Sequence, residues 1–101
     1  MTINKFFENH LEEIQRDILS KLNREFSAHE FIQKFSQAFQ TEYTNFLSKY
    51  KSSPFRIVHS LIAKALLRFS LELNIRKIQE KQTDPNIFGN RDRISGWIKT
   101  N

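Results

Sequence analysis

The strongest constraint on the fold is the spacing of apolar side chains, which recur at steps of three and four. The first such series consists of Ile3, Phe7, Leu11, Ile14, Ile18 and Leu22. These steps keep side chains on one face of an α-helix. Thr2 precedes the series as a candidate N-cap, and Asn23 and Arg24 follow it where a helix of this length ends. We therefore predict one N-terminal helix in segment 1–24.

The second helix has the clearest start signal in the chain, FSAHEF at residues 26–31. Ser27 as N-cap can accept from the amide of Glu30, and Glu30 can reach back to the amide of Ser27, as in a capping box. Phe26 and Phe31 flank this box as a hydrophobic staple. An aromatic series follows, made of Phe31, Phe35, Phe39, Phe46 and Tyr50. Its spacing allows one helix to about residue 50 or two helices with a turn near residues 40–42.

A third helix is predicted from Pro54 to about Ser70 or Leu73, because Ser53 followed by Pro54 is typical of an N-cap and a first helical residue. Its expected buried side consists of Phe55, Val58, Leu61, Ile62, Ala65, Leu66 and Phe69. The apolar pattern weakens after Asn74. Residues 75–101 can form a short helix or a β-hairpin with a loop at residues 83–93, and composition does not decide between them.

Composition supports one domain, residues 1–101, divided into segments 1–24, 27–74 and 75–101. The chain has ten phenylalanines and no cysteine. We predict a mainly α fold, with three amphipathic helices around one Phe-rich core and a small C-terminal element. The sequence shows neither a signal peptide nor an apolar run of roughly 18 residues, so we expect a cytoplasmic protein.

Enzyme motifs are absent from the sequence, and we expect a non-enzymatic protein without cofactor or metal. His10, Glu13 and Asp17 lie on one side of the predicted first helix and are candidate ligands for zinc or a similar ion. Asp17 and Lys21 also form an ordinary i,i+4 pair, however, and we expect a solvated helix face instead. His29 is expected to be exposed and neutral. His59 lies at the edge of the apolar stripe, which favours a partly buried histidine with a satisfied hydrogen bond.

The formal net charge of +5 is unevenly distributed. Residues 1–48 carry 5 basic and 7 acidic side chains, whereas residues 49–101 carry 11 basic and 4 acidic ones. This asymmetry indicates an anionic partner or head-to-tail self-association.

The outer face of the third helix is the main candidate surface. Arg56, Ser60 and Lys64 project from it beside Ala63, and small residues between basic ones let a helix approach a groove. Lys49 and Lys51 flank the N-terminus of this helix, where backbone amides can bind a phosphate. Leu67 and Leu71 fall near the same side, which another element or a second chain can cover.

The order of these elements resembles that of winged-helix proteins. The helix at FSAHEF, the break near Gln40, TNFLSKY and SSPFRIVHSLIAKALL resemble a helix-turn-helix, and the remaining residues supply two strands and a wing. The resemblance covers about residues 27–101 and rests on element order. It implies that the third helix enters the major groove and that Arg91 and Arg93 of the wing contact the DNA backbone. The first helix is then an extra packing or dimerisation element, and Trp97 seals the core.

Two functional hypotheses follow. The first is a nucleic-acid-binding module, with DNA favoured over RNA, whose contacts are Lys49, Lys51, Arg56, Ser60, Lys64, Arg91 and Arg93. The alternative is a helical protein–protein interaction or self-assembly module. In that case the N-terminal helix pairs with a partner or forms a homodimer through Ile3, Phe6, Phe7 and Leu11.

Overall fold

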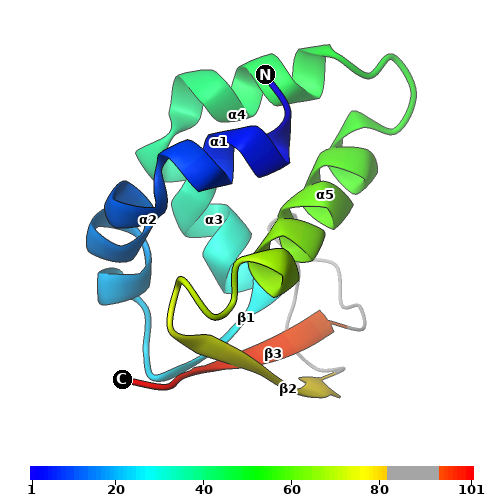
Figure 1. The fold of residues 1–101 in the computed structure, drawn as a ribbon. Coiled ribbons are helices and arrows are strands. Elements are labelled where there is room, and N and C mark those ends of the chain that lie inside the picture. Colours follow the sequence, from blue (N-terminus) through cyan, green and yellow to red (C-terminus); the bar gives the residue numbers. More distant parts are fainter. Residues whose placement is uncertain (82–93) are drawn as a thin grey trace.

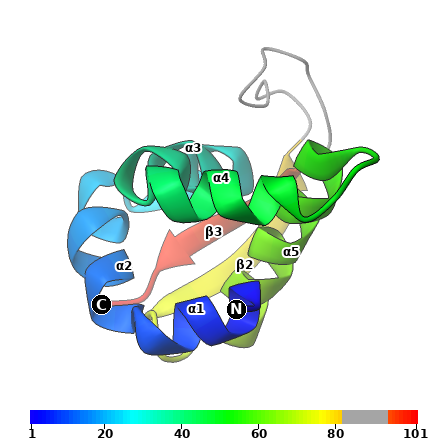
Figure 2. The same ribbon diagram turned by 90° about the horizontal axis from the view of Figure 1, so that it is seen from above.

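A computed structural model describes residues 1–81 and 94–101 and shows a mainly helical protein with a small antiparallel sheet below the helices (Figure 1). Seen from above, α3 and α4 lie along one side of the strands and α1 lies along the opposite side, with α5 next to α1 (Figure 2). The predicted class, helices around one Phe-rich core with a small C-terminal element, is confirmed.

The N-terminal segment is not the single helix that its spacing predicts. It forms α1 (Ile3–Asn9), α2 (Leu11–Asp17) and the 3₁₀ helix η1 (Leu19–Lys21). The break lies at His10, whose backbone N–H donates to the carbonyl of Phe7 while its ring nitrogen Nδ1 lies 2.8 Å from the carbonyl oxygen of Phe6. The ring also stacks on Phe6, at 4.0 Å between centroids. His10 therefore satisfies the last turn of α1 with its own side chain and ends that helix.

The capping box predicted at FSAHEF is confirmed. The Glu30 N–H donates to Ser27 Oγ at 3.1 Å, and the Ser27 N–H donates to Glu30 Oε1 at 2.9 Å. Ser27 ends strand β1 (Glu25–Ser27), and α3 (Ala28–Ala38) follows. Of the two alternatives for residues 27–50, the structure has two helices, because Phe39 leaves helical geometry before α4 (Gln40–Ser48). The Phe39 ring packs 5.0 Å from the Phe6 ring, between centroids.

Helix α5 (Pro54–Arg68) starts at the predicted residue, but Ser53 does not cap it through its side chain. Ser53 instead adopts left-handed backbone geometry, with φ 50°. Most of the predicted buried side is confirmed, including Val58 and Leu66. Phe55 is the exception, since 43% of it is exposed. It lies in the first turn of α5, where its ring contacts His59 edge-on instead of entering the core.

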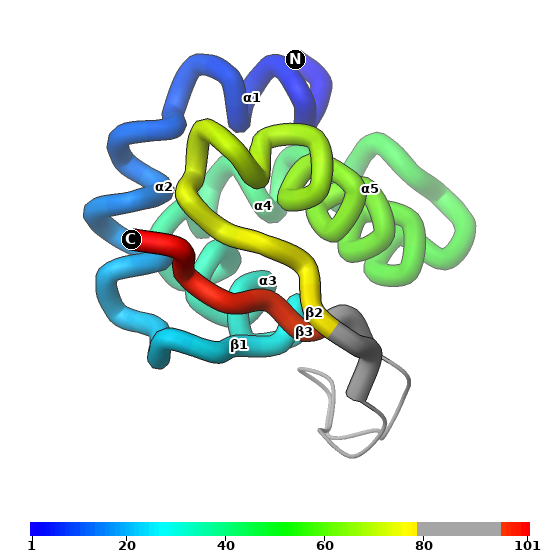
Figure 3. The backbone as a smooth tube through the Cα atoms, turned by 60° about the horizontal axis from the view of Figure 1, so that its bottom comes forward, coloured from blue at the N-terminus to red at the C-terminus, as the bar shows by residue number. Residues whose placement is uncertain are grey.

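The C-terminal element consists of β2 (Ile75–Lys81) and β3 (Ile94–Lys99), which pair antiparallel, so the helical alternative is wrong. Strand β3 is central, in the order β1-β3-β2 (Figure 3). Phe26 of β1 lies opposite Trp97 of β3, and Lys77 of β2 lies on the other side of Trp97. Trp97 is 1% exposed and belongs to the core, as the sequence predicts.

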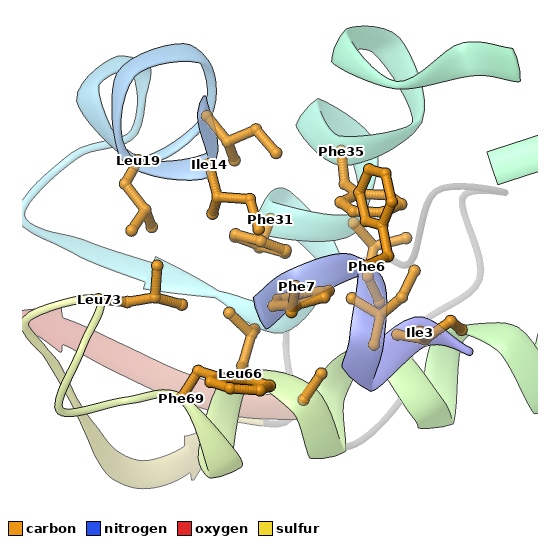
Figure 4. Close-up of a cluster of buried hydrophobic side chains, with 14 of the residues drawn as sticks. Ile3, Phe6, Phe7, Ile14, Leu19, Phe31, Phe35, Leu66, Phe69 and Leu73 are labelled. Carbon is orange, nitrogen blue, oxygen red and sulfur yellow. The ribbon is translucent and has the colours of Figure 1, made fainter. Parts of the chain in front are cut away.

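The apolar face of α1 is used inside the chain. Phe7 lies between Phe31 of α3 on one side and, on the other, Leu66 of α5 and Phe69, the residue directly after α5 (Figure 4). Its ring stacks on that of Phe35, at 5.8 Å between centroids. The residues proposed to pair with a partner therefore do not form a free surface. Three of them, Ile3, Phe6 and Phe7, are buried, and Leu11 is partly buried against the core.

Candidate nucleic-acid interface

The outer face of α5 carries Arg56, Ser60 and Lys64 in a row, and all three are exposed. Their spacing of four residues follows the helical repeat, so they share one side while Val58 and Ile62 turn into the core. Ala63 is half-buried beside the row. The predicted arrangement of these side chains on α5 is thus confirmed, and their role in binding stays a prediction.

The two lysines before α5 have different surroundings. Lys51 is exposed in the connector. Lys49 donates from Nζ to the carbonyl oxygen of Met1, and its ammonium lies 5.3 Å from the centroid of the Phe46 ring. Lys49 is therefore directed toward the N-terminal end of α1, although it remains exposed.

The segment around α5 is basic without interruption, because residues 43–71 contain five basic side chains and no acidic one. Among the side chains that the structure describes, the ion pairs are Lys5 with Glu8 and Arg16 with Asp17. None of the five basic side chains thus has a carboxylate partner there. They are Lys49, Lys51, Arg56, Lys64 and Arg68.

Arg68 was missed among the predicted contacts, although it continues the row from Lys64 by four residues. It is exposed at the end of α5, and its guanidinium carbon lies 5.7 Å from the centroid of the Phe69 ring. Arg76 and Lys77 of β2 are two further exposed basic residues. Arg91 and Arg93, the predicted wing contacts, lie outside the described residues.

His59 is half-buried beside this face and has the satisfied hydrogen bond expected of it. Its Nε2 lies 2.6 Å from the hydroxyl oxygen of Tyr43, and the two rings stack. Burial, reinforced by the nearby His29, lowers the pKa of His59 to about 4. At neutral pH His59 is therefore uncharged. His29 itself is half-buried, not exposed as predicted, and it lies near His59 of α5.

Two of the three candidate metal ligands in the N-terminal segment, His10 and Asp17, have other partners. His10 Nδ1 faces the carbonyl of Phe6, and Asp17 accepts from the Arg16 guanidinium at 3.0 Å rather than pairing with Lys21. The hydrogen bond from Arg16 lowers the pKa of the Asp17 carboxyl. In the part of the chain that the structure describes, no three histidine, aspartate or glutamate side chains gather closely enough to hold a metal.

No protein-family model, curated protein or solved structure matches this chain. Among the described helices, none has the length and apolar character required to cross a bilayer.

Proposed function

We propose that this protein is a small, non-enzymatic nucleic-acid-binding module that acts on DNA in the cytoplasm. The observation that carries the proposal is the exposed row Arg56, Ser60 and Lys64 on α5, within a segment that has no acidic residue. Arginine and lysine side chains neutralise phosphates, and this is the main source of affinity for nucleic acids. Ser60 and Ala63 are small enough to let the helix backbone approach the duplex.

Duplex is favoured over single strand because the surface formed by the described residues lacks a stacking platform. Proteins that bind single strands place successive bases on exposed aromatic rings. Among the described residues the large apolar side chains that are exposed are Met1, Phe55, Leu67 and Leu71, with Phe55 as the one aromatic. The surface thus offers charge and a helix rather than a series of rings.

The winged-helix interpretation assigns α5 to the groove and the β2–β3 pair to the wing. Antiparallel pairing of β2 with β3, directly after α5, supports that assignment. It predicts phosphate contacts from Arg91 and Arg93 in addition to those from α5.

Fluorescence anisotropy with a random duplex and a random single strand, measured across a salt series, tests the proposal. We expect tighter binding to duplex and a linear fall of log K with log salt that corresponds to several released counterions. Absence of binding at low salt would overturn the proposal, and preference for the single strand would overturn the choice of duplex.

A double variant locates the surface. Arg56→Ala with Lys64→Ala should lower the salt slope by about two counterions, roughly one for each basic side chain that no longer meets a phosphate. The matched control is Lys5→Ala with Lys21→Ala, which removes the same charge from exposed lysines outside the basic segment. Equal weakening in both variants would show that net charge, not this face, drives binding. Arg91→Ala with Arg93→Ala tests the wing in the same assay.

The second candidate function is self-association into a homodimer, now through Leu67 near the end of α5 and Leu71 in the turn after it, instead of through α1. Leu67 is 53% exposed and Leu71 is 85% exposed. Each is followed by an exposed charged residue, Arg68 and Glu72, of opposite sign. Two antiparallel copies can therefore bring complementary charges together around the leucines. Sedimentation of the wild type and of Leu67→Ser with Leu71→Ser tests this function, and a monomeric wild type at high concentration would exclude it.

A further inference from the structure

A pocket lies where the N-terminal end of α1 meets the end of α4 and the middle of α5. Its volume is about 350 Å³. Figure 2 shows the N-terminal end of α1 beside α5, and contacts join these two helices. The volume falls within the range of pockets that hold small molecules, roughly 300–1,000 Å³.

One part of the pocket lining is apolar. Ile3 of α1, Phe46 of α4 and Leu61 of α5 contribute to it. Ile3 and Phe46 belong to the buried core, and Leu61 packs against that core. Leu61 and the small exposed parts of Ile3 and Phe46 form the apolar wall of the pocket, and a ligand with an apolar body would remove that exposed surface from water.

The other part of the lining is positively charged. Lys49 and Lys64 line the pocket, and among the described residues no aspartate or glutamate does. The groups that contact the Lys49 ammonium are neutral, namely the carbonyl of Met1 and the ring of Phe46. Neither lysine has an ion pair within the described residues. Two ammonium groups beside one pocket repel each other. An anion between them attracts both groups and offsets their repulsion.

We propose that this pocket binds a small organic anion, an apolar body that carries one carboxylate or phosphate. The apolar body lies against Ile3, Phe46 and Leu61, and the anionic group lies between Lys49 and Lys64. Lysine accepts either anion because it acts as a point charge with rotatable donors. Since both lysines also belong to the basic surface, a bound anion competes there with nucleic-acid phosphate. That consequence alone rests on the proposed function.

Amide chemical shifts in a titration of the full chain test the pocket with four probes. Benzoate and phenyl phosphate carry both features, benzyl alcohol lacks the charge, and inorganic phosphate lacks the apolar body. We expect at least one of the first two to shift amides in segments 2–4, 46–50 and 61–64 and to bind about tenfold tighter than both of the others. Equal binding of benzyl alcohol or of inorganic phosphate, or shifts outside these segments, would overturn the proposal. The titration contains no nucleic acid, so its outcome is independent of the proposed function.

Lys64→Gln and Lys51→Gln form a matched pair of variants, since both lysines are exposed and only Lys64 lines the pocket. Lys64→Gln should weaken the binding of the anionic probe by about fivefold, the order expected for one charge near water. Lys51→Gln should leave it unchanged. Equal weakening in both variants would mean that the anion is attracted by net charge alone, which contradicts a defined site.

Discussion

At the residue scale, two serines occupy N-cap positions, and they differ in what their side chains do. Ser27 accepts from Glu30 N–H at 3.1 Å in a complete capping box, whereas Ser53 makes no cap bond and has φ 50°. Ser27→Ala should lower the free energy of unfolding by about 1–2 kcal/mol, because it leaves an amide at the start of α3 without its partner. Ser53→Ala should change it by less than about 0.5 kcal/mol. Urea denaturation measures both values, and equal decreases would contradict the difference in capping.

The partial burial of His59 makes the stability of the fold depend on pH. Its pKa falls from 6.5 to about 4 because of burial and the proximity of His29. Between these values the unfolded chain binds a proton that the folded chain does not bind, so the free energy of unfolding decreases as pH falls from 6.5 to 4. Since His59 is only half-buried, solvent screening limits the decrease to about 1–2 kcal/mol.

Chemical denaturation at a series of pH values tests this dependence, with His59→Gln as the control variant. Glutamine can keep a hydrogen bond with Tyr43 but does not titrate. Between pH 6.5 and 4, the free energy of unfolding of this variant should therefore decrease less than that of the wild type, by the contribution of His59. An unchanged slope would show that other groups cause the acid sensitivity.

At the scale of single elements, α1 is the element whose role changes most between sequence and structure. Phe7 is 0% exposed and stacks on Phe35 and Phe69. Phe7→Ala should therefore lower the free energy of unfolding by about 3–5 kcal/mol, the range for a buried phenylalanine. Phe7→Glu should unfold the chain rather than dissociate an oligomer, because it places an unpaired charge in the core.

Phe55→Ala is the matched control, since the same atoms are removed from a ring that is 43% exposed. It should lower the free energy of unfolding by less than about 1.5 kcal/mol, because the ring buries less apolar area than that of Phe7. Thermal or urea unfolding gives both values, with sedimentation to record the association state. Similar decreases for the two variants would contradict the central place of Phe7 in the core.

Elements with local start signals could be predicted, and elements fixed by distant contacts could not. The capping box and the Ser53–Pro54 pair place the starts of α3 and α5 correctly. Strand β1 has three residues, and Phe26 is a strand residue because it lies opposite Trp97, 71 positions later. The break at His10 depends on the hydrogen bond between the His10 ring and the Phe6 carbonyl. The spacing of apolar residues does not reveal this bond.

The same distinction applies to the candidate sites. Spacing along one helix predicted the exposed row on α5, and the same step of four extends to Arg68. The pocket was not predictable, because Lys49 and Lys64 come beside Ile3 only when α1, α4 and α5 pack together. A site on one helix face follows from the sequence, and a site between helices requires the fold.

At the scale of the whole molecule, β3 joins parts of the chain that are far apart in sequence. It pairs with β1, which leads directly into α3, and with β2, which follows α5. The Lys99 N–H donates to the carbonyl of Arg24, and Lys99 Nζ donates to the carbonyl of Leu22 at 2.6 Å. The sheet is therefore part of the same core as the helices and not an appended element.

Trp97 provides a test of this connection, because it is the single tryptophan of the chain and is 1% exposed in the central strand. Its fluorescence reports the environment of the sheet, whereas circular dichroism at 222 nm reports mainly the helices. We expect the two signals to give the same midpoint in urea and the same slope, as in a single cooperative transition. Phe7→Ala, far from Trp97 in sequence, should shift both midpoints together. A fluorescence transition at lower urea than the helical one would mean that β3 detaches before the helices unfold, which contradicts one shared core.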